Sequence, residues 1–235
     1  MKPFVIAIDG PSGAGKSTLG RRLARALGLL YVDTGAMYRA VALAAVEANV
    51  SAQDSEGLTE IARRARVELS GDPDRLRVAL DGRDVTEAIR TEQASRLASV
   101  VSTVPGVRRE LVRRQREMGA AGAGVVLDGR DIGTVVFPNA DVKFFLTARA
   151  EERARRRYEQ DHERAPGLTL EDTLADINTR DTRDSTREDS PLRVAEDAVV
   201  IDTTGLSKEE VFARMLEVVR ERADQSKAQS PKSEV

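Results

Sequence analysis

One pattern near the amino terminus constrains this chain more than any other feature. The pattern G-x-x-x-x-G-K-[ST] is met by nine consecutive residues: Gly10, Pro11, Ser12, Gly13, Ala14, Gly15, Lys16, Ser17 and Thr18. An unbroken apolar run at 4–8 precedes it, as expected of a strand buried on both faces of a parallel sheet. Leucines recur at four-residue spacing over 19–27 and predict a helix that Gly28 can end. Strand, glycine-rich loop and helix are therefore expected in direct succession.

This succession suits a polyphosphate ligand. Glycines let backbone N–H groups turn inward around the anion, and the N-terminus of the following helix adds its partial positive charge. Lys16 would reach the β- and γ-phosphates, and the Ser17 hydroxyl would ligate Mg²⁺. The alternative, a glycine-rich turn with a chance lysine, is disfavoured by the complete motif and its context. The sequence thus predicts a nucleoside triphosphate site.

The overall charge gives no general attraction to nucleic acid or to an anionic membrane, because 37 Lys and Arg residues face 39 Asp and Glu residues. The absence of cysteine excludes disulfides, thiol catalysis and cysteine metal sites. No secretory signal pattern is present, and no apolar run approaches the ~20 residues of a membrane helix. We therefore expect a soluble, cytoplasmic monomer with small-molecule substrates and no nucleic-acid or membrane partner.

Five short apolar runs separated by helical patterns indicate an α/β fold with a doubly wound, five-stranded parallel sheet. The runs lie at 4–8, 29–32, 125–127, 142–146 and 199–201. Helices on both faces would complete a three-layer P-loop fold, with its core in residues 1–223. Residues 65–90 depart from this plan, because they alternate polar and apolar side chains between turn signals. They predict a small β-rich insertion.

Two other segments stand apart from the predicted core. A strongly charged helix is expected from about 150 to 163, and it ends before the Pro166-Gly167 break. Residues 224–235 are polar and poor in apolar side chains, so we expect a disordered tail there.

Ligands of such sheets bind outside the carboxyl ends of the strands, which draws attention to the residues after each run. Four of the five predicted strands are followed at once by an aspartate: Asp9, Asp33, Asp128 and Asp202. The tetrapeptide Asp-Gly-Arg-Asp occurs twice, at 81–84 and at 128–131. The first copy has ordinary hairpin-turn chemistry within the insertion, whereas the second ends a buried strand. Only the second copy is therefore a site candidate.

Ten arginines are expected near this edge of the sheet: Arg39, Arg108, Arg130, Arg149, Arg153, Arg156, Arg157, Arg180, Arg183 and Arg187. Their planar guanidinium groups match the geometry of phosphate and carboxylate. Several of them around a phosphate-binding loop indicate a second, phosphorylated substrate that faces the nucleotide. A phosphate acceptor is already an anionic nucleophile, so the transfer needs alignment and charge neutralisation but no catalytic base.

Three separated motifs carry a family resemblance: residues 8–18 (IDGPSGAGKST), 33–39 (DTGAMYR) and 128–138 (DGRDIGTVVFP). In this order they closely resemble bacterial cytidylate (CMP) kinases, which are P-loop nucleoside monophosphate kinases. The resemblance extends from the first predicted strand to the last helix. It implies transfer of the γ-phosphoryl group of ATP to CMP and dCMP, with Mg²⁺ as cofactor, to give ADP and CDP or dCDP.

The resemblance also implies roles for segments and residues. The insertion at 65–90 would belong to the nucleoside monophosphate-binding region, and about 150–168 would form a lid over ATP. Residues 10–18 would bind ATP, and Ser17, with Asp128 through water, would hold Mg²⁺. The acceptor would contact Thr34, Arg39, Ser99, Arg108, Arg130, Asp131, Arg180, Asp184 and Arg187. The predicted catalytic residues are Lys16, Arg130, Arg153, Arg157 and Arg180.

Within the acceptor set, Arg39 and Arg130 would hold the phosphate, and Ser99, Arg108 and Asp131 would read cytosine. An acidic or hydroxyl acceptor takes the exocyclic amine, and an arginine donates to the ring carbonyl. Uracil reverses this pattern and would leave buried groups unpaired. Thr34 stands where other family members can carry serine, and the substitution keeps the hydroxyl.

Two assignments have structural alternatives. Asp128 could cap a turn at a strand end, and the helix at 150–163 could be a solvated helix stabilised by its own glutamates. The function has alternatives as well: another P-loop kinase with a different small-molecule acceptor, or a nucleotide-dependent nucleic-acid binder. Against the last of these stand the net charge of −2 and the aromatic content of 3%, which leaves few stacking platforms.

Overall fold

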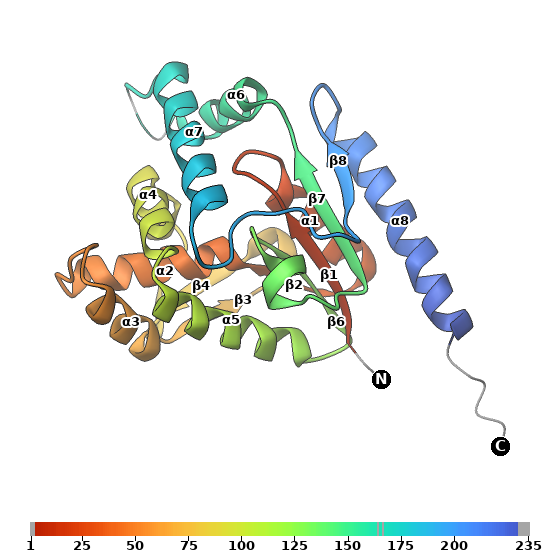
Figure 1. The fold of residues 1–235 in the computed structure, drawn as a ribbon, viewed down its shortest axis with the longest axis horizontal. Coiled ribbons are helices and arrows are strands. Elements are labelled where there is room, and N and C mark those ends of the chain that lie inside the picture. Colours follow the sequence, from red (N-terminus) through yellow and green to blue (C-terminus); the bar gives the residue numbers. More distant parts are fainter. Residues whose placement is uncertain (1–2, 164, 166, 230–235) are drawn as a thin grey trace.

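The sheet at the centre of the molecule has five strands, all parallel, in the order β2-β6-β1-β7-β8. The structure is a computed structural model that describes residues 3–163, 165 and 167–229. The strands are β1 (Phe4–Asp9), β2 (Leu30–Asp33), β6 (Gly124–Asp128), β7 (Val142–Thr147) and β8 (Val199–Asp202). Because all five run the same way, their carboxyl ends meet at one edge, the upper edge in Figure 1.

Both faces of this sheet are covered, which explains the unbroken apolar runs. Val5 and Ala7 of β1 face a core shared with α2 (Thr34–Glu47) and α5 (Pro105–Ala120). Ile6 and Ile8 face a second core, shared with α1 (Lys16–Leu27) and α8 (Lys208–Gln229). A strand that alternates between two buried faces is mostly apolar, and the buried Lys143 of β7 is paired with Asp197 at 2.7 Å. Figure 1 shows α8 on one side of the sheet and α2 with α5 on the other.

A second, smaller sheet is antiparallel and consists of β3 (Val67–Ser70), β4 (Arg77–Leu80) and β5 (Arg83–Asp84). The turn between β4 and β5 is Asp81-Gly82, and both residues have positive φ, 51° and 81°. This left-handed pair is what a two-residue hairpin requires. The sheet packs through Val78 and Leu80 into the same core as Leu58 of α3 (Ser55–Arg64). The two sheets together confirm the predicted fold class.

The remaining helices surround the carboxyl edge of the large sheet. They are α4 (Glu92–Val101), α6 (Ala150–Asp161) and α7 (Leu170–Thr186), and Figure 1 shows all three beside or above the strand ends. Short helical turns lie at η1 (Pro73–Arg75), η2 (Ala88–Arg90) and η3 (Ile132–Val136), the last being π-helical. These elements place side chains from distant parts of the sequence around the phosphate-binding loop.

Some boundaries differ from those expected. Helix α2 begins at Thr34, two residues early, because the Asp33 side chain accepts a hydrogen bond from the backbone N–H of Ala36 at 2.8 Å and caps the helix. Helix α8 continues to Gln229, so the segment expected to be disordered from 224 is helical over its first six residues. The rest of that segment, 230–235, lies outside the described residues.

Candidate active site

The phosphate-binding loop joins β1 to α1 through glycines that no other residue can replace easily. Gly10, Gly13 and Gly15 have φ values of 143°, 78° and 90°. A Cβ atom on Gly10 would stand 2.0 Å from the backbone oxygen of Leu146, and one on Gly13 would meet the backbone of α6. The loop therefore holds its shape because a neighbouring strand and a helix press against bare backbone.

Lys16 begins α1 and is only 6% exposed. Its Nζ donates a hydrogen bond of 2.7 Å to the backbone oxygen of Pro11, across the loop. Burial, reinforced by the charge of Arg130, lowers the pKa of Lys16 to about 7, while the carboxylate of Asp128 acts in the opposite direction. An anion bound next to this buried ammonium group would stabilise its charged form.

The oxygen atoms next to the loop suit a hard cation. The Ser17 hydroxyl donates to Asp128 Oδ2 at 2.8 Å, and the Tyr31 hydroxyl donates to Asp128 Oδ1 at 2.6 Å. Burial, and the nearby charge of Asp33, raise the pKa of Asp128. No group of three or more acidic, His or Cys side chains that could hold a metal occurs among the described residues. Mg²⁺ commonly uses one or two protein oxygens and completes its shell with water and phosphate, so Ser17 and Asp128 fit this ion.

Across from the loop, arginines from four elements are each held by an aspartate. The pairs are Arg39–Asp33 at 3.1 Å, Arg130–Asp184 at 2.7 Å, Arg180–Asp176 at 2.8 Å, and Arg108–Asp131 in direct contact. Burying a guanidinium group is costly unless it is paired, and the carboxylates supply that pairing. Arg187 lies beside the last pair, with its Nη2 3.8 Å from Asp131 Oδ1.

The Arg108–Asp131 pair is the most deeply buried of the four, with side-chain exposures of 3% and 8%. Arg108 also donates to the backbone oxygen of Ser102 at 3.2 Å, and its guanidinium group lies 5.8 Å from the centre of the Tyr38 ring. The guanidinium donor of Arg108 and the carboxylate acceptor of Asp131 are thus held side by side in a buried part of the cavity wall.

Several buried N–H groups of these arginines make no hydrogen bond within the described part of the chain. They are Nε of Arg39, Nε of Arg108, Nη2 of Arg187 and Nε of Arg180, which contacts Asp176 only as an ion pair. A buried donor without an acceptor costs about 1–3 kcal/mol, so such groups are rare unless a ligand satisfies them. Their number and charge indicate a site for an anionic ligand.

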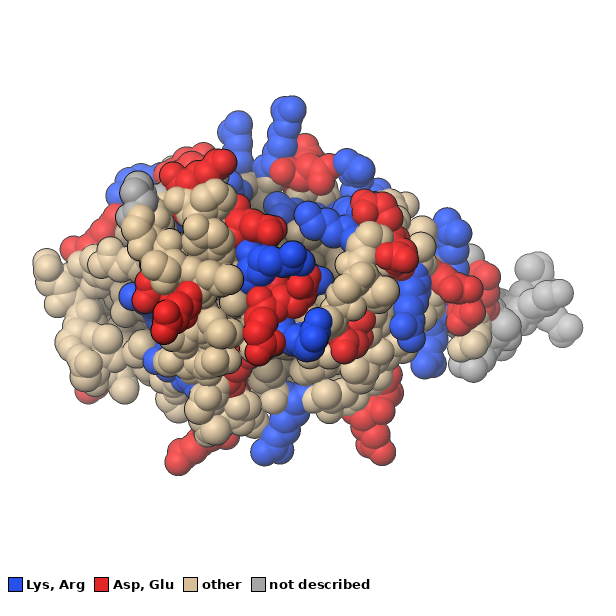
Figure 2. Space-filling view, turned by 90° about the horizontal axis from the view of Figure 1, so that it is seen from above, with Lys and Arg blue, Asp and Glu red and all other residues tan. Residues whose placement is uncertain are grey.

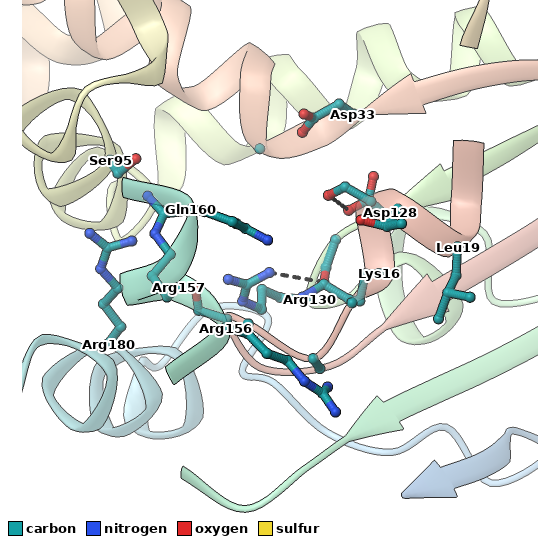
Figure 3. Close-up of a pocket in the computed structure, with 18 of the residues that line it drawn as sticks. Lys16, Leu19, Asp33, Ser95, Asp128, Arg130, Arg156, Arg157, Gln160 and Arg180 are labelled. Atoms are coloured by element: carbon teal, nitrogen blue, oxygen red, sulfur yellow. Dashed lines mark hydrogen bonds between the residues drawn. The ribbon is translucent and has the colours of Figure 1, made fainter. Parts of the chain in front are cut away.

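One cavity of about 890 Å³ is lined by Lys16, Ser17, Asp128 and the arginines Arg39, Arg108, Arg130, Arg180 and Arg187. Figure 2 shows basic side chains, interleaved with acidic ones, around a hollow in the face above the strand ends. In Figure 3, Lys16 and Arg130 lie side by side at the centre, with Asp33 and Asp128 on one side. Arg157, Gln160 and Arg180 lie on the opposite side, on α6 and α7. The cavity therefore has two parts, one against the phosphate-binding loop and one among the paired arginines.

All nine acceptor residues expected from the sequence line the cavity: Thr34, Arg39, Ser99, Arg108, Arg130, Asp131, Arg180, Asp184 and Arg187. The Thr34 hydroxyl donates to the backbone oxygen of Asp128 at 2.7 Å, and Ser99 Oγ accepts from Arg183 at 2.8 Å. Arg183 was among the ten arginines, but its contact with α4 has no sequence signal.

The two arginines expected on one face of the charged helix separate. Arg157 lines the cavity and pairs with Asp161 at 2.6 Å. Arg153 is 5% exposed and lies outside the cavity, because α6 packs on the phosphate-binding loop at this turn. Its guanidinium group donates to the backbone oxygens of Ala148 and Ser12 and pairs with Asp181 at 2.7 Å. Arg153 thus connects α6 to the phosphate-binding loop through Ser12, and its expected catalytic role stays a prediction.

The sequence analysis did not predict the contacts that two buried side chains, Tyr31 and Asp9, make in the site. Tyr31 holds Asp128, as described above, and an aromatic residue in a strand gives no signal of such a role. Asp9 accepts hydrogen bonds from the backbone N–H groups of Ile132 and Gly133, at 2.8 and 2.7 Å. Burial raises the pKa of Asp9 to about 6, against the effect of these two bonds. Its position after a strand was visible, but its partners were not.

Comparison with known proteins agrees with this geometry. The family model described as cytidylate kinase matches residues 6–221. The chain belongs to the cytidylate kinase family. The cytidylate kinase of Caldanaerobacter subterraneus is 52% identical over 215 residues, which cover 92% of this chain and 94% of that protein. The cytidylate kinase of Bacillus subtilis is 49% identical over 222 residues, covering 94% and 99%.

Among solved structures, this cytidylate kinase family member is similar to a gluconokinase from Sinorhizobium meliloti, with a TM-score of 0.51 and 15% identity. That match covers 97% of this chain and 98% of the other. An uncharacterized protein from Eubacterium ventriosum matches with a TM-score of 0.52 at 11% identity, covering 94% and 99%. At these identities the likeness concerns the fold alone, which is that of the P-loop kinases.

The family assignment makes the chain an ATP-dependent nucleoside monophosphate kinase, a transferase. Among the described residues, no helix combines the length and apolar character that crossing a membrane requires.

Proposed function

We propose that this kinase transfers the γ-phosphoryl group of ATP to CMP and dCMP, with Mg²⁺, giving ADP and CDP or dCDP. The observation that carries the proposal is the buried Arg108–Asp131 pair at the edge of the cavity. Cytosine offers an exocyclic amine beside a ring carbonyl, and Asp131 and Arg108 offer the complementary acceptor and donor. Uracil would set a carbonyl against the carboxylate and leave buried groups unpaired, which a site of this kind rejects strongly.

The arginines support the choice of a monophosphate as acceptor. Arg39 lines the same cavity as Lys16, Arg130 lies beside Lys16 in Figure 3, and Arg180 lies across from them on α7. The acceptor phosphate would exchange places with the carboxylates that now hold these groups. Because that phosphate is an anion, the chain has to align it with the γ-phosphate and neutralise charge, without a catalytic base.

Mg²⁺ would be held by the Ser17 hydroxyl and, through water, by Asp128. When bound, it would neutralise charge on the β- and γ-phosphates. Arg157 on α6 would add positive charge as the lid at about 150–168 closes and excludes water.

A coupled ADP-release assay with CMP, dCMP, UMP, AMP and a non-nucleotide acid tests the proposal. We expect kcat/KM to be highest for CMP and dCMP, and the CMP-to-UMP ratio to fall about 100-fold in Asp131→Ala, since the amine loses its acceptor. Asp131→Asn, which keeps the shape of the side chain, should lower the CMP-to-UMP ratio of kcat/KM as well. A wild-type preference for UMP, AMP or the non-nucleotide acid would contradict the proposal.

A further inference from the structure

Asp9 is a buried acid that the reaction described above does not use. It ends β1, is 4% exposed, and both of its carboxylate oxygens are occupied. Oδ1 accepts from the N–H of Ile132 at 2.8 Å, and Oδ2 accepts from the N–H of Gly133 at 2.7 Å. Two short, charge-assisted bonds to successive amides fix both the distance and the orientation of the segment that carries them.

That segment directly follows the acceptor loop, which consists of Gly129, Arg130 and Asp131 after β6. Ile132 and Gly133 begin η3 and follow directly on Arg130 and Asp131. The other end of the loop is also attached to β1, since the N–H of Gly129 donates to the backbone oxygen of Ile8 at 3.0 Å. Arg130 and Asp131, assigned to the acceptor phosphate and base, are thus flanked on both sides by hydrogen bonds to Ile8 and Asp9, the last two residues of β1.

The other side of Asp9 is the phosphate-binding loop, which begins at the next residue, Gly10. One carboxylate therefore joins the segment that grips ATP to the segment that grips the acceptor. A displacement of about 1 Å between two reacting groups can cost about 100-fold in rate, so a rigid connection at this point matters to the reaction.

We propose that Asp9 is a positioning residue that fixes the acceptor loop relative to the phosphate-binding loop. The inference rests on the proposed function, because it takes Arg130 and Asp131 as the groups that hold the phosphate and read the base. Asp9 touches neither substrate in this scheme. It acts through the placement of the two residues that precede its amide partners.

A second route from Asp9 to the reaction has to be distinguished. The charged groups that act on Asp9 are Asp131 and Lys16, and the negative charge of Asp9 favours the protonated form of Lys16. If this second route dominated, loss of that charge would mainly weaken ATP binding. Loss of the two hydrogen bonds would instead disturb the acceptor. The KM values of the two substrates therefore separate the routes.

Three variants supply the test. Asp9→Asn keeps the shape but presents an NH₂ group to one of the two N–H donors. Gly133→Ala approaches the same contact from the other side, since its Cβ would stand 3.4 Å from Asp9 Oδ2 and 3.0 Å from Lys143 Cδ. Asp141→Asn is the matched control: Asp141 Oδ2 accepts from the N–H of Val5 at 2.8 Å, at the opposite end of the same strand.

For Asp9→Asn we expect the KM for CMP to rise about tenfold and the CMP-to-UMP ratio of kcat/KM to fall about tenfold, with the KM for ATP within about twofold. Calorimetric titration with CMP alone should show the same weakening. Gly133→Ala should shift both acceptor quantities in the same direction by about two- to threefold. Asp141→Asn should lower the melting temperature and leave both KM values and the ratio unchanged.

Two results would overturn the inference: acceptor KM and ratio unchanged in both site variants, or a rise confined to the KM for ATP. If Asp9→Asn does not fold, Gly133→Ala decides alone. A failure of the proposed function is visible separately in the wild type, as a preference for an acceptor other than CMP. The KM of that preferred acceptor would then be compared across the same three variants.

Discussion

The two parts of the cavity present different groups to an anion. Against the phosphate-binding loop, a ligand would meet main-chain amides, the N-terminus of α1 and one lysine. Among the arginines, it would meet side chains from α2, α5, α7 and the loop after β6, each already paired with a carboxylate. In the first part the binding groups are positioned by the backbone conformation of the loop. In the second part they are arginine side chains held in ion pairs with aspartates.

This difference has a consequence for selectivity. Backbone amides bind any polyphosphate that fits, and they need no rearrangement when it arrives. Paired arginines must leave their carboxylates, so an acceptor binds only where its own charges and hydrogen bonds replace what the aspartates supplied. The part of the site that must choose among nucleotides is therefore the part built from exchangeable pairs.

The largest effect is expected from changing the backbone-built part. In Gly10→Ala, the new Cβ would collide with the oxygen of Leu146 at 2.0 Å, so the loop must deform. We expect the free energy of unfolding to fall by about 3–5 kcal/mol and calorimetric ATP binding to be lost. Gly28→Ala is the control, because Gly28 also has positive φ, 65°, but has open space around it. It should cost about 1 kcal/mol and leave ATP binding intact.

If Gly10→Ala bound ATP with normal affinity, side chains rather than backbone shape would determine the donor site. The contrast drawn between the two parts would then be wrong.

A smaller effect on stability but a large one on rate is expected in the arginine-built part. Arg130→Met should lower kcat/KM about 1,000-fold in steady-state assays, with little change in melting temperature, because a charge aimed at the moving group is removed. Arg114→Met is the matched control. Arg114 is equally well bonded, to the backbone oxygens of Ala62 and Ala65 and to Glu110, but lies away from the cavity.

For Arg114→Met we expect a loss of about 1–3 kcal/mol in the free energy of unfolding and kcat/KM within about twofold of the wild type. Similar rate losses in the two variants would mean that Arg130 acts only through stability.

The smallest expected effect is a difference in proton uptake between ligand binding at the two parts of the cavity. The pKa of Lys16 is lowered to about 7, so Lys16 is mostly neutral at pH 8, and a polyphosphate favours its charged form. ATP binding should therefore take up as much as about one proton at pH 8 and almost none at pH 6. Calorimetry in buffers of different ionisation enthalpy measures this uptake.

Lys16→Met should abolish the uptake, and its persistence in that variant would assign the proton to another group. The arginines stay charged throughout this pH range, so CMP binding should show no comparable uptake through them.

The sequence predicted the large sheet well because its three central strands, β6, β1 and β7, are buried on both faces. Each apolar run, such as 142–146, marked a strand to within one or two residues, and the Asp81-Gly82 turn was predicted from turn chemistry. The glycine-rich loop was equally visible, since its function depends on backbone shape at fixed spacing. These features depend on residues that are close in the sequence, so the sequence alone can predict them.

The rest depends on contacts between distant segments. Helical spacing placed Arg153 and Arg157 together, but it carries no information on which turn of α6 packs against the phosphate-binding loop. Tyr31 and Asp9 act through partners about a hundred residues or more away in sequence. The tail at 224–235 was judged by composition, whereas α8 extends over 224–229. Family resemblance gathered the acceptor residues, which spacing alone could not do.

The order of the strands also affects how the protein is made. β1 lies between β6 and β7, so its register pairs Phe4 with Gly124 and Ile6 with Val142. A nascent chain emerging from the ribosome therefore carries its first strand without a partner until more than half of its length has been synthesised. During that interval the apolar β1 segment is exposed to other chains and to chaperones. Nucleotide can protect the growing polypeptide only after β6 and β7 have emerged.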